Sequence, residues 1–199
     1  VEPIRRWVFK TPQSDALAVR KIFQHAKKAG HARLAILTAS DAFGAAGREE
    51  LKGLATQAGI AIAADEVFGP KDTDMTAQLT RIKGTAAQAI VVWGTNPGPA
   101  VIARNRVQLK IGLPLYMSSG VASKKFIELA GPENAEGILL PAGRLIAEGQ
   151  VPSSHPQKAI LAAYIKDYET RFKQPTSTFG GYAWDGIMLV AQAVKRAKA

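Results

Sequence analysis

Three stretches of small polar residues in this chain each follow an apolar run and precede a predicted helix. They are Thr38-Ala-Ser-Asp-Ala-Phe-Gly44, Trp93-Gly-Thr-Asn-Pro97 and Met117-Ser-Ser-Gly120. Hydroxyl and amide side chains beside glycine, at the start of a helix, can hydrogen-bond to an anion or a polar ligand. Turn and helix-capping chemistry explains each stretch alone equally well, so only the three together indicate a ligand site.

Three aromatic residues lie near the ends of predicted elements: Phe43, Trp93 and Trp184. An aromatic ring beside polar loops can form the wall of a ligand site, or it can simply fill the core. Trp184 belongs to the stretch Phe179-Gly-Gly-Tyr-Ala-Trp-Asp185, which we expect at the entry to the last helix. There, Asp185 can interact with the positive end of the helix dipole or face a ligand.

Patterns for catalysis and for metal or cofactor binding are missing from the sequence. It has no cysteine, no Gly-x-Ser-x-Gly, no phosphate-binding loop, no dinucleotide-binding glycine pattern and no His-x-x-x-His spacing. The carboxylate pairs Asp65/Glu66 and Asp72/Asp74 are expected at or after the end of one strand, and helix capping accounts for Asp74. The histidines are expected at helix ends, away from the carboxyl ends of strands: His25, His31 and His155. We therefore expect no enzyme activity, no cofactor and no metal.

The chain carries a formal net charge of +10 over its 199 residues. A basic protein can bind nucleic acid, an anionic membrane surface or an acidic ligand. Here the lysines and arginines are scattered, and most fall in or just after the last turn of a predicted helix, where cations are favoured. Because no zinc-finger, ribonucleoprotein or basic-zipper pattern is present, we expect no nucleic-acid partner.

Strands and helices alternate over residues 7–141. Short apolar runs bounded by glycine, proline or small polar residues predict strands at 7–11, 33–38, 60–68, 89–94, 115–117 and 137–140. Segments that are mostly closed by glycine predict helices at 16–29, 45–58, 75–83, 99–107 and 123–130. The predicted fold is α/β, with a doubly wound, mostly parallel sheet. The three polar stretches then lie at the carboxyl edge of that sheet.

The alternation stops near Pro141. Residues 142–154 form a predicted loop, and two amphipathic helices follow at 156–172 and 182–197 without a strand of their own. Such helices need an apolar surface to cover. Either they pack on the same sheet, or their natural partner lies outside this chain.

In order and spacing, these segments resemble type I periplasmic solute-binding proteins of ABC transporters, in the branched-chain amino acid-binding (Leu/Ile/Val-type) group. Asp41-Ala-Phe-Gly44 is similar to that family's D-x-[YF]-G loop, and Tyr182-Ala-Trp-Asp-Gly186 is similar to its Y-D-A helix entry. Residues 72–83 are similar to a family helix. Residues 7–11 and 135–139 resemble the strands that enter and leave the second lobe. The match covers essentially the whole chain.

The resemblance implies the fold of periplasmic binding protein-like I, a two-lobed architecture that binds its ligand in a cleft. Residues 1–141 would be the second lobe, and residues 142–199 the hinge crossing with helices that belong to the first. The chain is then expected to be a fragment that lacks most of the first lobe. A small-molecule ligand, an ABC-transporter permease and a periplasmic (or extracellular, membrane-anchored) location are implied as well. Without their natural cover, helices 156–172 and 182–197 are expected to promote dimerisation.

The resemblance also implies ligand contacts. Carried over by position, they lie in the three polar stretches and near the last helix: Ser40, Asp41, Phe43, Thr95, Asn96, Ser118, Ser119, Trp184 and Asp185. Relatives that bind amino acids often have an acidic residue in the stretch at 118–119, where it pairs with the ligand ammonium. This chain has two serines there. The expected ligand is a small polar or carboxylate-bearing molecule: an amino acid, an aromatic acid or an amide. Because losing a buried ion pair is costly, the serines disfavour an α-amino acid and favour a ligand without an ammonium group.

Two other functions are compatible with such a fold. A ligand-sensing domain of a receptor or transcription regulator uses the same architecture, and would be distinguished by a DNA-binding or membrane segment elsewhere in the gene. An enzyme on a flavodoxin-like sheet would need a phosphate loop or an acid–base pair, and the sequence favours neither.

Overall fold

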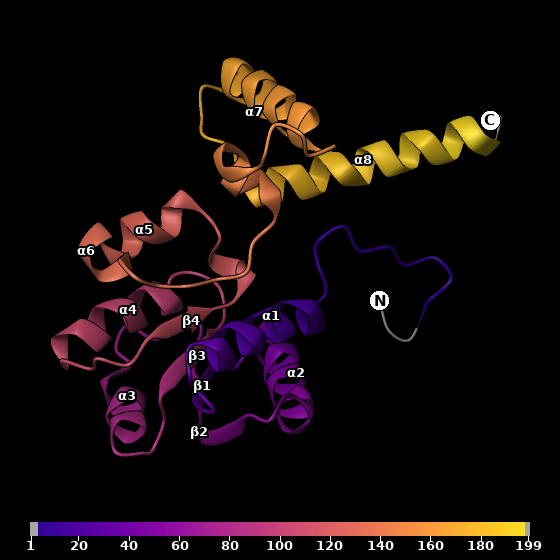
Figure 1. Cartoon of the computed structure of the whole chain (residues 1–199). Coiled ribbons are helices and arrows are strands. Elements are labelled where there is room, and N and C mark those ends of the chain that lie inside the picture. The colour runs from indigo at the N-terminus through magenta and orange to yellow at the C-terminus, as the bar shows by residue number, and fades with distance from the viewer. Residues whose placement is uncertain (1–3, 198–199) are drawn as a thin grey trace. The chain divides into compact units, whose positions relative to one another are not determined.

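The computed structural model describes residues 4–197, which fold into two compact units (Figure 1). The first, the α/β unit, is Asp15–Pro141. The second, the helical unit, combines residues 4–14 with residues 142–197. The assignment of either unit to a particular lobe stays a prediction.

The α/β unit is built on four parallel strands: β1 (Arg33–Ala39), β2 (Ala61–Phe68), β3 (Ala89–Trp93) and β4 (Leu115–Met117). Their order across the sheet is β2-β1-β3-β4. Every residue of β3 and β4, and all of β1 except Arg33, is buried. This matches the continuous apolar runs in the sequence, because a parallel strand is covered on both faces. The predicted doubly wound α/β fold is confirmed.

Helices cover both faces of the sheet (Figure 1). Helices α1 (Asp15–Lys28) and α2 (Ala42–Ala58) share one core with Ile36 and Val91 of the strands. Helices α3 (Thr76–Lys83), α4 (Gly98–Gln108) and α5 (Lys124–Ala130) share the other core with Leu37 and Val92. Alternate residues of β1 and β3 therefore serve opposite cores, as the two-residue period of a strand requires. A 3₁₀ turn, η1 (Ser119–Val121), and a short helix, α6 (Pro132–Ala135), complete the unit.

Local sequence sets both ends of α2. Asp41 is the N-cap, and its Oδ1 accepts a hydrogen bond of 2.7 Å from the Gly44 N–H. At the other end Gly59 adopts a left-handed conformation with φ of 66°, and its N–H donates to the carbonyls of Ala55 and Thr56. The helix begins directly after β1, so its first turn lies at the carboxyl end of that strand.

The helical unit contains a 3₁₀ segment, η2 (Arg144–Gln150), and helices α7 (Lys158–Phe172) and α8 (Thr178–Ala197). Rings join the two helices: Tyr164 of α7 meets Trp184 of α8 edge-on, with centroids 5.6 Å apart. Tyr182 of α8 donates a hydrogen bond of 2.8 Å to Gln13 Oε1, which ties residues 4–14 to this unit. Both predicted helices exist, although α8 begins four residues before the predicted start.

Two predicted strands are wrong. Residues 7–11 form no strand, and Trp7 and Phe9 are 78% and 82% exposed. Their alternating pattern has no neighbouring strand to pair with among residues 4–14, and a strand without a ladder partner leaves its backbone groups unsatisfied. Residues 137–140 are reduced to one bridge between Leu139 and Tyr116, because Gly137 turns the chain with φ of 72°.

Two further details differ from prediction. Asp74 does not cap α3: the N-cap position is Met75, and Asp74 accepts instead from the backbone N–H of Thr76 at 2.8 Å. The predicted loop at 142–154 contains η2. The cap of α3 and the 3₁₀ segment η2 are local backbone features, and neither changes the alternation of strands and helices.

Candidate functional site

The strand order places a topological switch point between β1 and β3. The chain leaves β1 toward β2 on one side and then crosses to β3 on the other side. In open α/β sheets, ligands bind beyond the carboxyl ends of the strands at such a point. Ser40, Asp41 and Phe43 follow β1, while Thr95 and Asn96 follow β3. Five predicted site residues therefore flank the switch point.

The loops after β1, β3 and β4 meet at this edge. Ser118 Oγ donates a hydrogen bond of 3.0 Å to the carbonyl oxygen of Gly94, which joins the loop after β4 to the loop after β3. A Cβ placed on Gly120 would lie 2.9 Å from Phe43 Cε1 and 2.9 Å from the Gly94 oxygen. Only glycine fits there without displacing its neighbours. The structure thus brings together the three loops that carry the seven predicted residues of the α/β unit.

Some of these residues stabilise the loops themselves. Ser118 is completely buried, and its Oγ also accepts from the Gly120 N–H at 3.3 Å. Asp41 Oδ1 accepts the hydrogen bond that caps the N-terminus of α2. Phe43 is half-buried and packs on Trp93, with ring centroids 6.0 Å apart. Trp93 itself is fully buried under α2, so of the two rings only Phe43 has surface to offer a ligand.

The remaining residues at this edge are accessible. Thr95 is exposed, and Asn96 and Ser119 are half-buried. Asn96 Oδ1 is a buried atom, and within residues 4–197 it has no hydrogen-bond partner. Thr38 Oγ1 and Trp93 Nε1 are also buried atoms without a hydrogen-bond partner in this range. The two residues pair with each other across β1 and β3. Buried polar atoms without partners are rare in folded proteins, because each one costs free energy until it finds a hydrogen bond. Thr38 begins the first polar stretch of the sequence but is not among the ligand contacts that the resemblance implies.

Acidic side chains near the end of β2 are engaged elsewhere. Burial raises the pKa of the Asp65 carboxyl, but hydrogen bonds and charge from Arg48 and Lys52 outweigh it, and the net pKa is lowered. Arg48 Nε lies 2.7 Å from Asp65 Oδ1. Glu66 pairs with Arg81 at 2.7 Å. Asp72 accepts a hydrogen bond from the backbone N–H of Gly69. Asp65, Glu66 and Asp72 thus each stabilise the local fold through a structural contact.

The two predicted residues outside the α/β unit lie in a pocket of the helical unit. Trp184 and Asp185 line a cavity of about 270 Å³ together with Arg144, Tyr164 and Tyr182. The pKa of Tyr182 is raised, first by burial and then by the charge of Asp185. Both residues belong to the second turn of α8 and not to its entry, because the helix begins at Thr178. Trp184 is 46% exposed and offers its ring to this cavity.

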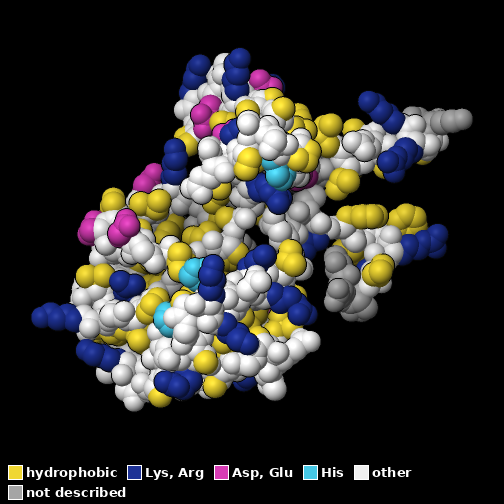
Figure 2. All heavy atoms as spheres, in the orientation of Figure 1, with side chains coloured by type: hydrophobic (Ala, Val, Ile, Leu, Met, Phe, Trp, Pro, Cys, Tyr) yellow, Lys and Arg dark blue, Asp and Glu magenta, His cyan; other side chains and the backbone are white. Residues whose placement is uncertain are grey.

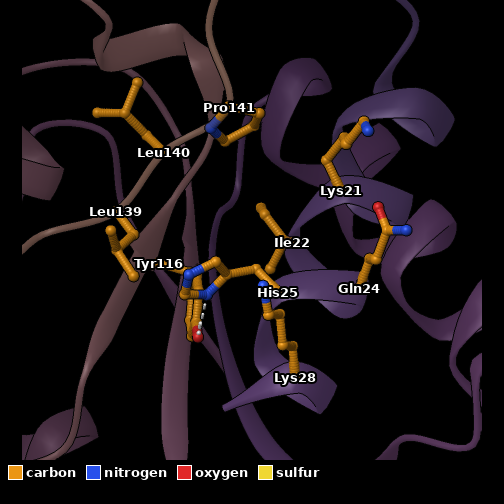
Figure 3. Close-up of a pocket in the computed structure, with 9 residues that line it drawn as sticks. All are labelled: Lys21, Ile22, Gln24, His25, Lys28, Tyr116, Leu139, Leu140 and Pro141. Atoms are coloured by element: carbon orange, nitrogen blue, oxygen red, sulfur yellow. Dashed lines mark hydrogen bonds between the residues drawn. The ribbon is translucent and has the colours of Figure 1, made fainter.

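A groove that the sequence analysis missed lies beside β4. Figure 3 shows residues of α1 on one side and residues 139–141 on the other, with Tyr116 between them. The Tyr116 hydroxyl shares a hydrogen bond of 3.0 Å with His25 Nδ1, and burial raises the pKa of Tyr116. We call it the α1–β4 groove, a hollow of about 490 Å³ lined by Lys21, Ile22, Gln24, His25, Lys28, Tyr116, Leu139, Leu140 and Pro141. No sequence signal marks it, because α1 and β4 are about 90 residues apart.

Two properties of the described residues bear on the kind of site. Within residues 4–197 no group of three histidine, aspartate or glutamate side chains could hold a metal ion. None of the helices in this range combines the length and apolar character needed to cross a membrane.

Comparison with known proteins gives consistent results. A family model described as periplasmic binding protein matches residues 2–199. The chain is similar to the leucine-, isoleucine-, valine-, threonine- and alanine-binding protein of Pseudomonas aeruginosa. The two are 21% identical over 164 residues, which are 82% of this chain and 41% of the relative.

Among solved structures, the chain is similar to an extracellular ligand-binding receptor from Rhodopseudomonas palustris HaA2. The TM-score is 0.91 at 23% identity, over 99% of this chain and 55% of the receptor. It is also similar to a leucine-binding protein from Thermotoga maritima, with a TM-score of 0.78 at 21% identity over 92% of this chain and 50% of that one. Identities this low establish the shared fold only. The chain spans about half the length of the relatives it matches.

Proposed function

We propose that this chain, which belongs to the periplasmic binding protein family, is part of a protein that captures a small solute for an ABC importer. The observation that carries the proposal is the convergence of three polar loops at the switch point of the sheet, beside Thr38 and Asn96 oxygens that are buried and have no hydrogen-bond partner among the described residues. The curated relative is an amino acid-binding protein by name. A membrane permease is the proposed partner, and the proposed location is the periplasm, or the cell exterior on a membrane anchor.

We propose that binding is the whole activity of this site. The hydroxyls of Thr95 and Ser119 and the amide of Asn96 can orient a ligand, while the one carboxylate in these loops, Asp41, uses Oδ1 to cap α2. His25 lies instead on α1 and is hydrogen-bonded to Tyr116. No catalytic step is needed for solute capture.

The proposed ligand bears a carboxylate or an amide and has no ammonium group. Asp41 is the only acidic residue in the three loops at 40–44, 94–97 and 118–120, and one of its oxygens caps α2. The hydroxyl and amide donors of these loops favour a ligand carboxylate or amide. Phe43 adds a half-buried aromatic ring that suits an aromatic acid. We assign Trp184 and Asp185 a further contact role, on the basis of the cavity that they line in the helical unit.

Thermal-shift measurements on the complete natural protein test this ligand class. A ligand that binds only the folded state raises the melting temperature, and the rise grows with ligand concentration. We expect benzoate or 4-hydroxybenzoate to raise it, and leucine and valine to leave it unchanged. A rise with leucine and none with the aromatic acids would overturn the proposed ligand class.

We also propose that the helical unit associates with a second copy of the chain. Ile187, Leu189 and Val190 on α8 are 70%, 56% and 62% exposed. Beside them α7 and α8 form an apolar hollow of about 370 Å³ that includes Tyr168 and Phe172. Exposed apolar patches of this kind mark interaction surfaces, and a second copy supplies the same apolar surface in return.

A further inference from the structure

Helix α1 has one strongly basic face. Its apolar residues Val19, Ile22 and Phe23 are buried against the sheet and α2. The opposite face exposes four cations, which we call the α1 ridge: Arg20, Lys21, Lys27 and Lys28. Figure 2 shows dark blue side chains over α1, with the magenta acidic side chains of this view gathered elsewhere. The ridge ends near the amino edge of the sheet, away from the switch point.

The charges of the α1 ridge are unpaired, in contrast to those near β2. Among residues 4–197, none of the four cations forms an ion pair or a hydrogen bond through its side chain. On the β2 side, Arg48, Lys52 and Arg81 each have a carboxylate partner within 2.9 Å. Four adjacent like charges repel one another, and a surface that retains them suits a negatively charged partner.

Grooves run along both sides of the ridge. The α1–β4 groove lies on one side. On the other side, a hollow of about 430 Å³, the α1–α2 groove, is lined by Arg20, Phe23, Gln24, Lys27, Leu54, Gln57 and Ala58. In each groove cations stand at the rim, while apolar side chains such as Phe23 and Tyr116 lie almost fully buried at the floor. Exposed cations and recessed apolar side chains thus lie next to each other along α1.

We propose that the α1 ridge binds an acidic segment of a partner protein, whose carboxylates pair with the four cations while its apolar side chains enter the flanking grooves. The recessed apolar floors favour a peptide over a flat membrane. A bilayer binds through apolar side chains that protrude. Among the described residues of α1 and its two grooves, the exposed large apolar side chains are Leu17, at 52%, and Leu139 inside the α1–β4 groove, at 39%. The inference is independent of the proposed solute site, which lies at the opposite edge of the sheet.

Fluorescence anisotropy on the full chain tests this inference. The probe is a labelled short peptide of glutamates interspersed with leucine and phenylalanine. The test variant is R20Q/K21Q/K27Q/K28Q. The matched control, K71Q/K124Q/K166Q/K195Q, removes the same charge from exposed lysines elsewhere. We expect the ridge variant to weaken binding by at least about tenfold and the control by less than about threefold, and added salt to weaken binding to the natural chain.

Two results would overturn the inference. Equal loss in the two variants would show attraction by the net charge alone. Sedimentation with phosphatidylglycerol vesicles that depends on the ridge, together with no peptide binding, would make the ridge a membrane surface. A Leu54→Asp variant, checked for folding by circular dichroism, places a negative charge in the α1–α2 groove and is expected to weaken peptide binding with the ridge intact.

Discussion

At the scale of single residues, Gly47 illustrates how closely α2 approaches the sheet. A Cβ at this position would overlap the indole ring of Trp93, which is fully buried. We expect Gly47→Ala to lower the free energy of unfolding by about 1–3 kcal/mol, because the ring or the helix must move. Gly53 is the matched control: it lies on the exposed side of the same helix, with open space around it.

Gly53→Ala is expected to raise the free energy of unfolding by up to about 1 kcal/mol, since alanine is the better helix former. Urea denaturation of both variants measures the difference. Equal effects of the two substitutions would contradict the described packing of α2 on Trp93.

The candidate site shows which residue-level features a sequence can reveal. The small polar stretches after β1, β3 and β4 predicted a shared edge, because the ends of parallel strands necessarily meet. The sequence could not show that Ser118 uses its hydroxyl to hold Gly94, a contact across 24 residues. Nor could it show that the side-chain oxygens of Thr38 and Asn96 are buried and have no hydrogen-bond partner within residues 4–197. Which hydrogen bonds a side chain forms depends on distances in the folded structure, and a local sequence pattern does not determine these.

At the scale of elements, ion pairs join β2 to α2 and α3. The pKa of Asp65 is lowered in the folded state, so its ionised form stabilises the fold above the unfolded-state pKa of about 4. That contribution is lost as the pH falls through the folded-state pKa. Arg48 and Lys52 are 39% and 53% exposed, and solvent screening keeps the gain small, at about 1 kcal/mol.

We therefore expect Asp65→Asn to be less stable than the natural chain at pH 7, with the difference shrinking as the pH falls toward 3. Urea denaturation at a series of pH values measures it. Glu49→Gln, at an exposed carboxylate of α2, is the control and should show no such convergence. A gap between Asp65→Asn and the natural chain that stays constant down to pH 3 would refute the role given to this ion pair.

Elements with continuous apolar runs were the easiest to predict. Strands β1 and β3 and the helices beside them occur where the pattern placed them, within a few residues. The strands predicted at 7–11 and 137–140 failed for a different reason: each is short, and pairing with a neighbour decides whether such a segment becomes a strand. One has no neighbour in its unit, and the other touches β4 only through Leu139.

At the scale of the whole molecule, the apolar face of α8 predicts concentration-dependent association. We expect light scattering coupled to gel filtration to show dimers whose fraction rises with protein concentration, since each copy buries the exposed side chains of the other. Ile187→Gln/Val190→Gln should remain monomeric. Val107→Gln/Ile127→Gln changes two other exposed apolar residues, each 45% exposed, and should still dimerise.

A natural chain that is monomeric at every concentration would contradict this expectation. Equal loss of dimer in the two double variants would also contradict it, because α8 would then have no special part in association.

The central claim is that the carboxyl edge of the sheet binds the solute. Isothermal titration calorimetry on the complete natural protein, using the aromatic acid that binds best, tests it through two matched threonines. Thr95 follows β3 at this edge, and Thr56 is an exposed threonine near the end of α2. We predict that Thr95→Val weakens binding by about tenfold, the cost of one lost hydrogen bond, and that Thr56→Val leaves it unchanged. Equal affinities for the natural protein and both variants would contradict the account.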